Sequence, residues 1–280
     1  MSIKSILLLL DDSTACAKRM TVSFELARRF GAHLTGLYVI PTPSIIYGAP
    51  HAPVTEIESE VQRSQERGQA SIAAFEDMAK KEGVSSVEPR LVNAMGEAVS
   101  DVAALHGRYA DLLILGQNDP NDLRSLGIGV VESTLLGSGR PSLFVPYIGV
   151  LAPMLDHVIV AWDASQESTR AVHDALPFLV EAKKVTVLVI NPRIGPDGHG
   201  EQPGADIATA LARHGVDVTV QEDQVDRIAI GEAVLSRISD LQGGMLVMGA
   251  YGHARLRELI LGGVTDTILR EMTVPVLMSH

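Results

Sequence analysis

Two similar stretches decide the fold: SILLLLDDSTACAKRM at residues 5–20 and HVIVAWDASQESTRAV at residues 157–172. Each begins with a run of apolar residues and continues into an aspartate (Asp11 or Asp163), one further residue and a serine. Short apolar runs without alternation are typical of strands buried on both faces of a parallel sheet. Each stretch therefore predicts a buried strand followed by a turn and a helix.

The same order of segments recurs along the rest of the chain, which indicates an internal repeat. We place the two repeats at residues 1–148 and 153–280, joined by a short apolar junction. The further matches, in chain order, are HLTGLYVIP with KVTVLVINP, GEAV with a second GEAV, DLLILG with GMLVMG, and GIGVVESTLLGSGRPSLFVP with LGGVTDTILREMTVPVLMS.

Within each repeat, strand-like and helix-like segments alternate. Such alternation predicts an α/β protein made of two tandem doubly wound domains, each with a five-stranded parallel sheet. The strands are expected at 5–10, 33–40, 87–92, 110–116, 141–146, 157–162, 184–190, 216–222, 244–250 and 274–279. Helices are expected at 14–30, 56–82, 96–107, 167–182, 204–214, 231–241 and from about Thr265 onward.

Composition excludes several functional classes. The formal net charge of −11 disfavours nucleic-acid binding, which depends on Lys and Arg neutralising phosphates. Cys16 is the only cysteine, so an intrachain disulfide is impossible, and we expect it to be a small core residue. No apolar run approaches the roughly 20 residues of a membrane span, so we expect a cytoplasmic protein without membrane contact.

Four glycines lie in two clusters within MGAYGHARLRELILGGVTDTIL, residues 248–269. We expect Gly249 to let a bound group approach the backbone and Gly252 to adopt a positive φ. Gly262 and Gly263 precede the last helix, whose N-terminus favours an anion, and Thr265 is expected to cap that helix or bind phosphate. Alternatively, all four glycines serve only the turns of the fold.

The spacing of these glycines resembles the nucleotide-binding signature of the universal stress proteins. The resemblance covers nearly the whole chain twice, through the Asp-x-Ser turn, the five-strand alternation and the terminal TVPVLMS strand. It implies ATP as ligand, with or without Mg²⁺, and contact between Asp163 and the adenosine moiety. Two positions depart from the family pattern: Ala161 replaces a proline, and Gly263 replaces a serine or threonine. The implied nucleotide site comprises Ala161, Asp163, Val189, Met248, Gly249, Gly252, Gly262, Gly263, Val264 and Thr265.

The first repeat departs further from that signature. Gly116 is followed by QNDPNDLRS, without a counterpart of Gly252, and Asp119 and Asp122 are expected near Asp11 and the adjacent Asp12. Carboxylates repel a phosphate chain. We therefore predict one ATP per chain, in the second repeat, with the first repeat acting as a packing partner.

No catalytic motif accompanies these features: the sequence lacks a Walker lysine motif, a nucleophile elbow and a zinc-binding pattern. We expect a regulatory ATP-binding stress-response protein that acts on a protein partner. A nucleotide-independent interaction scaffold and a slow ATPase remain alternatives. The resemblance also implies that the fifth strands of the two repeats pair within the chain, and whole chains are expected to form homodimers. The loops at 41–54 and 191–204 are either lids or plain connectors.

Overall fold

The computed structural model describes residues 2–42, 54–149, 154–192, 202–252 and 263–280. The chain forms two compact units, Ser2–Arg140 and Pro141–His280, each with its own helices and strands. The fifth strand of the first repeat belongs to the second unit, because it pairs with a strand of that unit.

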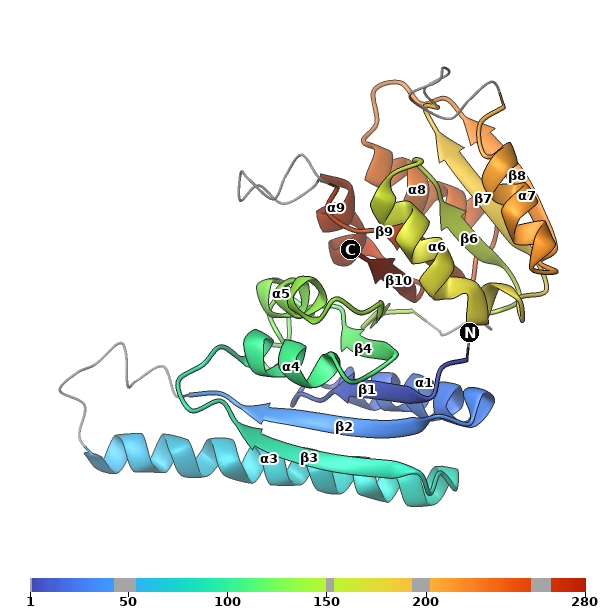
Figure 1. Cartoon of the computed structure of the whole chain (residues 1–280). Coiled ribbons are helices and arrows are strands. Elements are labelled where there is room, and N and C mark those ends of the chain that lie inside the picture. The colour runs from blue at the N-terminus through green and yellow to red at the C-terminus, as the bar shows by residue number, and fades with distance from the viewer. Residues whose placement is uncertain (1, 43–53, 150–153, 193–201, 253–262) are drawn as a thin grey trace. The chain divides into compact units, whose positions relative to one another are not determined.

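The first unit is built from alternating strands and helices (Figure 1). In chain order its elements are β1 (Ser5–Leu9), α1 (Cys16–Phe30), β2 (His33–Ile40), α3 (Val54–Glu82), β3 (Val87–Asn93), α4 (Val99–Gly107), β4 (Leu112–Gly116) and α5 (Ile128–Ser138).

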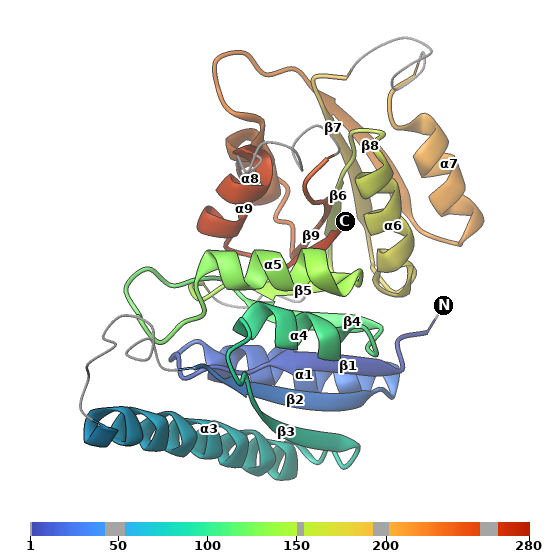
Figure 2. The same cartoon turned by 60° about the vertical axis from the view of Figure 1, so that its left-hand side comes forward.

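All strands of the first unit run parallel, in the order β3-β2-β1-β4. In this register, Leu7 of β1 lies opposite Thr35 of β2 and Leu113 of β4. Helices α1 and α3 pack together on one face of the sheet, and α4 and α5 pack together on the other (Figure 2). Because helices cover both faces, the strands carry continuous apolar runs.

Aromatic packing fixes α3 against the sheet of the first unit. The rings of Phe24 on α1 and Phe75 on α3 stack with their centroids 5.4 Å apart. Phe75 also lies against Gly36 of β2, where an added Cβ would come within 2.9 Å of the ring. Cys16 is buried on α1, as predicted.

The second unit repeats the same plan. Its elements are β5 (Ser142–Val145), β6 (Val158–Ala161), α6 (Gln166–Leu179), β7 (Val185–Ile190), α7 (Ala205–Arg213), β8 (Val218–Asp223), α8 (Ile230–Asp240), β9 (Met245–Gly249), α9 (Gly263–Glu271) and β10 (Val276–Ser279).

The strands of the second unit lie in the order β5-β10-β9-β6-β7-β8. They run parallel except for β5, which pairs antiparallel with β10 and places Leu143 opposite Leu277. Helices α8 and α9 pack together on one face, while α6 and α7 lie along the other (Figures 1 and 2). The predicted fold class and the pairing of the two fifth strands are therefore confirmed.

Two expectations fall largely on parts of the chain outside the described residues. The candidate lids at 41–54 and 191–204 lie mostly in the undescribed ranges 43–53 and 193–201.

Of the described helices, not one combines the length and the apolar character needed to cross a membrane.

His157, just before β6, makes a buried hydrogen-bonded chain in the second unit. Its Nδ1 lies 2.9 Å from the Leu241 carbonyl oxygen, which can only accept, so Nδ1 carries the proton. Nε2, 2.8 Å from the Thr186 hydroxyl, then accepts a hydrogen bond from it. The neutral imidazole is satisfied on both nitrogens, and burial lowers the pKa of His157.

We expect His157 to make stability depend on pH in weakly acidic solution. Because the folded-state pKa lies below the ordinary value of about 6.5, the unfolded chain binds the proton more readily. The contribution of His157 to the free energy of unfolding is therefore complete above about pH 6.5, the ordinary pKa of histidine, and is lost as the pH falls through the lowered folded-state pKa. Denaturant titrations from pH 7 to 5 should give His157→Gln a shallower slope than wild type, by up to about 1.4 kcal/mol per pH unit. Equal slopes for the two proteins would contradict this assignment.

Candidate functional site

The same Asp-Ser turn follows the first strand of each repeat. In the first, Asp11 Oδ1 accepts hydrogen bonds from the Ser13 backbone N–H at 3.0 Å and the Ser13 hydroxyl at 2.6 Å. In the second, Asp163 Oδ1 accepts from Ser165 at the same two distances. Both turns lie at the carboxyl ends of the strands, where open α/β sheets bind ligands.

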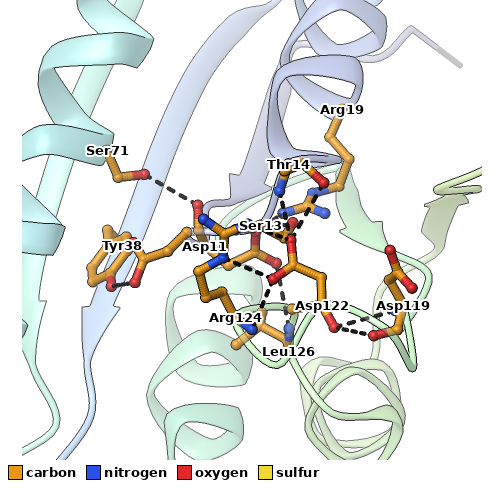
Figure 3. Close-up of polar contacts among 12 residues, drawn as sticks. Asp11, Ser13, Thr14, Arg19, Tyr38, Ser71, Asp119, Asp122, Arg124 and Leu126 are labelled. Atoms are coloured by element: carbon orange, nitrogen blue, oxygen red, sulfur yellow. Dashed lines mark hydrogen bonds and ion pairs between the residues drawn. The ribbon is translucent and has the colours of Figure 1, made fainter.

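In the first repeat, Asp11 is buried and bound by its own protein (Figure 3). The Arg19 guanidinium reaches from α1 and places Nη2 2.7 Å from Asp11 Oδ1. Arg19 is 1% exposed and passes beside Gly116, where a Cβ would collide with Nη1. Asp11 Oδ2 accepts a hydrogen bond from the Leu126 backbone N–H at 3.4 Å. The carboxylate is thus engaged on both oxygens.

The contact between Arg19 and Asp11 is an ion pair rather than a set of well-directed hydrogen bonds. Among the described residues, Nε and Nη2 of Arg19 have no hydrogen-bond partner, although Nη2 is close to the carboxylate. A buried ion pair with imperfect geometry regains only part of its desolvation cost.

A second carboxylate, Asp122, lies on the loop after β4 (Figure 3). Its Oδ2 accepts hydrogen bonds from the Thr14 backbone N–H at 3.0 Å and from Arg124 Nη2 at 3.0 Å, and Arg124 Nε donates to Oδ1 at 2.8 Å. The Arg124 guanidinium and these N–H groups hold the pKa of Asp122 well below its ordinary value. The expected gathering of aspartates around Asp11 is confirmed for Asp122.

Asp11, Arg124 and Leu126 border a cavity of about 400 Å³ at the carboxyl ends of β1 and β2. Apolar side chains lining it are Leu10, Val39, Pro41, Val99, Leu123 and Leu126. Polar side chains lining it include Asp12, Tyr38, Arg67 and Arg124.

Tyr38 and Asp12, which both line the cavity, interact directly. The Tyr38 hydroxyl donates to Asp12 Oδ2 at 2.9 Å, and Arg67 Nε lies 3.5 Å from the same oxygen. Burial, and then the Asp12 charge, raise the pKa of the Tyr38 phenol well above its ordinary value. Tyr38 is therefore a fixed hydrogen-bond donor to Asp12.

The second repeat has an open strand-end aspartate. Asp163 is exposed, and it accepts two hydrogen bonds from Ser165. At the position that corresponds to Arg19, the second repeat carries Ala171, which is fully buried. Ala164, between Asp163 and Ser165, has a φ of 58°, a left-handed conformation that costs a non-glycine residue about 1–2 kcal/mol.

Gly249 packs closely against the start of α6. A Cβ at Gly249 would lie 2.5 Å from the Ser168 backbone nitrogen and 2.8 Å from Glu167 Cβ, both at the start of α6. The missing side chain lets α6 approach the end of β9. This glycine serves packing.

Gly252 differs from expectation, because its φ lies outside the left-handed region. The neighbouring Tyr251 adopts that region instead, with a φ of 55°. A Cβ at Gly252 would meet only Glu167 Oε2 within 4 Å, at 3.9 Å. The contacts of the described residues therefore do not explain why position 252 is a glycine.

The last helix begins earlier than predicted. Helix α9 starts at Gly263, so Thr265 lies inside the helix and is not its cap. No atom of the described residues lies within 4 Å of a Cβ placed on Gly263. Thr265 is 4% exposed, and Val264 is half-buried. Gly262 lies outside the described residues.

The remaining predicted residues lie on neighbouring strands of the second unit. Ala161 ends β6, and Met248 is buried near the end of β9. Val189 of β7 is fully buried, and its Cγ2 would be 3.1 Å from a Cβ on Gly204, just before α7. The structure thus brings the carboxyl ends of β6 and β9 together and directs Val189 toward the start of α7.

Glu167 is a residue at this site that the sequence analysis missed. It lies in the first turn of α6, is 5% exposed, and its Oε2 would lie 3.9 Å from a Cβ placed on Gly252. The sequence feature that could have indicated Glu167 is its position, between the Asp-Ser turn and the apolar positions of an amphipathic helix. Its counterpart in the first repeat is Ala15.

The turn after β9 is held by His280. His280 Nδ1 lies 2.9 Å from the Ala250 carbonyl oxygen, and its ring meets Tyr251 edge-on with centroids 6.5 Å apart. These contacts fix the backbone that leads from Gly249 to Gly252. Among the described residues, no group of three or more His, Cys, Asp or Glu side chains could hold a metal ion.

The fold and the repeated strand-end turn define a tandem protein of the universal stress class. The sequence profile of the universal stress protein family matches residues 2–139 and again residues 154–280. The chain belongs to the universal stress protein family, with two copies of the family domain.

Known relatives agree with this assignment. The universal stress protein Slr1230 of Synechocystis is 23% identical over 299 residues, which cover 98% of this chain and 99% of that protein. A universal stress protein from Archaeoglobus fulgidus has a TM-score of 0.71 at 17% identity and covers 99% and 96% of the two chains. One from Pseudomonas aeruginosa gives 0.60 at 16% identity, covering 99% and 93%. These likenesses confirm the fold.

Proposed function

We propose that this chain is an ATP-binding stress-response protein with one nucleotide site, in its second repeat, that signals nucleotide occupancy to a protein partner. The site would comprise Asp163 after β6, Gly252 after β9, Gly262, and Gly263 at the start of α9. Binding, rather than turnover of ATP, would be its function.

The observation that carries this proposal is the contrast between Asp163 and Asp11. Asp163 is exposed to solvent, whereas Asp11 is buried and is bound by the Arg19 guanidinium and the Leu126 backbone N–H. A ligand hydroxyl or amino group can reach Asp163 without breaking an ion pair. Strain at Ala164 supports the proposal, because left-handed non-glycine residues gather at functional sites.

The glycines support a phosphate-binding role for part of the turn. Among the described residues, close contact with α6 explains why position 249 is a glycine. A Cβ on Gly263 would meet no described atom within 4 Å, and one on Gly252 would meet only Glu167 Oε2, at 3.9 Å. Open backbone beside a helix N-terminus suits a phosphate group. Gly252 and Gly263 are therefore the glycines that we assign to the ligand.

Glu167 bears on the form of the ligand. A buried carboxylate beside Gly252 would repel an uncompensated phosphate chain. Mg²⁺ is commonly bound by one or two carboxylates together with substrate phosphates and waters. The donor set fits a magnesium–nucleotide complex, in which Glu167 would face the metal ion.

Titration calorimetry with ATP and Mg²⁺ tests the proposal on wild type and Asp163→Asn. Wild type should bind one ATP per chain. Loss of a charged hydrogen-bond acceptor worth about 1.5–3 kcal/mol should weaken binding by roughly 10- to 100-fold in Asp163→Asn.

The matched control is Asp11→Asn in the first repeat. It should lower the free energy of unfolding, because Arg19 loses a buried partner, yet leave the ATP affinity within about twofold of wild type. Equal affinities of wild type and Asp163→Asn, or wild type without any heat of ATP binding, would reject the proposal. The second result would favour a nucleotide-independent scaffold.

A further inference from the structure

Strand β3 is an outer strand of the first unit, and β8 is an outer strand of the second (Figure 1). Each has a neighbouring strand on one side only, β2 for β3 and β7 for β8. The open side of an outer strand carries backbone N–H and C=O groups that can pair with a further strand, and proteins commonly prevent this with prolines or lysines. The two outer strands differ in this protection.

The register of β8 shows which of its residues face the open side. The Asn191 N–H at the end of β7 donates to the Asp223 carbonyl oxygen at 2.8 Å, so Asp223 and every second residue before it face β7. The backbone groups of Val218, Val220 and Glu222 therefore face away from β7. Among the described residues, none makes a hydrogen bond to these groups. Strand β8 thus offers a continuous row of free backbone donors and acceptors.

On β3 the same row is interrupted by a proline. The Leu34 N–H donates to the Ser86 carbonyl oxygen at 2.9 Å, which places the nitrogen of Pro89 on the open side of β3. Proline has no N–H to donate, and its position here is typical of an edge that is closed to pairing. Val220 is the third residue of β8, as Pro89 is of β3, and it supplies the missing donor.

The two edges also differ in charge. Residues 217–226, DVTVQEDQVD, include β8 and carry four carboxylates without a lysine or arginine. Asp223 is paired with Arg237 of α8, whereas Asp217 and Glu222 are exposed and have no ion-pair partner among the described residues. The single acidic and the single basic side chain of β3 form an ion pair with each other. The edge of β8 is therefore acidic, while β3 itself is neutral.

The side chains of β8 set the pattern of a matching strand. Val220 lies beside the start of α7, where a Cβ on Gly204 would come within 2.9 Å of its Cγ1, yet Val220 is 38% exposed. Glu222, two residues further on, projects from the same face of the strand. An added strand fits best with an apolar side chain opposite Val220 and a cation opposite Glu222, because such directly opposed pairs stabilise a sheet.

A second copy of this chain does not meet that requirement. Two β8 strands paired antiparallel about Val220 would place Asp217 of each copy opposite Asp223 of the other. Like charges directly opposite each other destabilise a sheet. The charge of the edge therefore favours a partner of opposite sign.

From these observations we propose that the open edge of β8 binds an extended, basic segment of another protein, which adds a strand to the sheet of the second unit. Main-chain hydrogen bonds to Val218, Val220 and Glu222 supply the affinity. The carboxylates of Asp217 and Glu222 select a segment that carries an apolar residue and a Lys or Arg two positions apart. This surface is separate from the ATP site proposed above, and binding to it requires no nucleotide.

The capped peptide Thr-Lys-Thr-Val-Thr-Lys-Thr tests the proposal, because its sequence reads the same in both directions and fits a parallel or an antiparallel strand. Fluorescence anisotropy of a labelled copy measures its affinity for the full chain without nucleotide. The same peptide with Glu in place of Lys should bind roughly tenfold more weakly.

Amide hydrogen exchange measured by NMR locates the bound peptide. At saturation, exchange of the Val220 and Glu222 amides should slow by about tenfold or more, because these N–H groups become hydrogen-bonded. Exchange of the Leu91 amide, on the open side of β3, should not change and provides the internal control.

Two variants test the edge itself. Val220→Pro introduces a proline at the position where β3 carries Pro89, so the chain should remain folded while its peptide affinity falls by roughly tenfold. Asp217→Lys combined with Glu222→Lys tests the charge without a proline. This double variant should prefer the Glu peptide to the Lys peptide.

Equal affinities of wild type for the two peptides, binding of neither, or unchanged affinity in a folded Val220→Pro would overturn the proposal. A double lysine variant that still prefers the Lys peptide would do the same. So would a dimer of the free chain that is lost in Val220→Pro, because a second copy would then occupy the edge. Asp163→Asn should bind the Lys peptide as wild type does, so the ATP proposal and this one can fail separately.

Discussion

Replacement of Gly252 and Gly263 by valine should abolish ATP binding while leaving the chain folded. The new side chains would project into space that the described protein atoms leave open, where we place the phosphate groups. Loss of several backbone contacts to a charged phosphate chain should weaken binding by more than 100-fold, measured by titration calorimetry. The free energy of unfolding should change by less than about 1 kcal/mol, because neither position is crowded.

Gly129→Val is the matched control in the first repeat. In the alignment of the repeats, Gly129 of α5 corresponds to Gly263 of α9, and it too has open space around it. This variant should bind ATP as wild type does. ATP binding that persists in the double valine variant, or that is lost equally in Gly129→Val, would contradict the placement of the site.

Arg19→Met should be the most destabilising of the substitutions considered for the first repeat. Methionine fills much of the volume but leaves the Asp11 carboxylate buried, at 6% exposure, without its cation. Removal of one member of a buried ion pair costs about 3–5 kcal/mol. Denaturant unfolding should show this loss as a lower midpoint of the transition.

A double-mutant cycle separates the ion pair from simple loss of packing. Arg19→Met combined with Asp11→Asn should recover part of the lost stability, because the uncompensated charge is gone, with a coupling energy of about 1–3 kcal/mol. Arg29→Met, on the exposed end of α1, should cost less than about 0.5 kcal/mol. A cost below about 1 kcal/mol for Arg19→Met, or additive effects in the cycle, would contradict the role given to the pair.

The elements of the fold could be predicted because burial leaves a strong pattern in sequence. Apolar runs such as residues 5–10 became strands covered by helices on both faces, and their observed bounds differ by one or two residues. The resemblance to the universal stress proteins implied the pairing of the two fifth strands, which the structure shows. That contact depends on the likeness of distant segments rather than on local preference.

The roles of individual residues were harder to predict, because they depend on distances between elements. Nothing local to Gly249 indicates that the backbone of α6 approaches it. Likewise, Thr265 looked like a cap because the residues before it are glycines, yet the helix already begins at Gly263.

Arg19 and Asp122 show what a closer analysis of the sequence could have found. Arg19 shares the inner face of α1 with Cys16 and Met20, and an arginine on the apolar face of a helix needs a buried acidic partner. Asp122 was expected to repel phosphate. Its carboxylate also accepts a hydrogen bond from the Thr14 N–H, as a bound anion would, and this contact depends on the three-dimensional arrangement. Sequence spacing does not contain that information.

A crystal structure of the chain grown with ATP and Mg²⁺ tests the central claim most directly. We predict one nucleotide per chain, with its adenosine moiety at Asp163 and its phosphate groups between Gly252 and the first turn of α9. An unoccupied second repeat under saturating ATP, or a triphosphate bound instead beside Asp122 in the first repeat, would contradict the account.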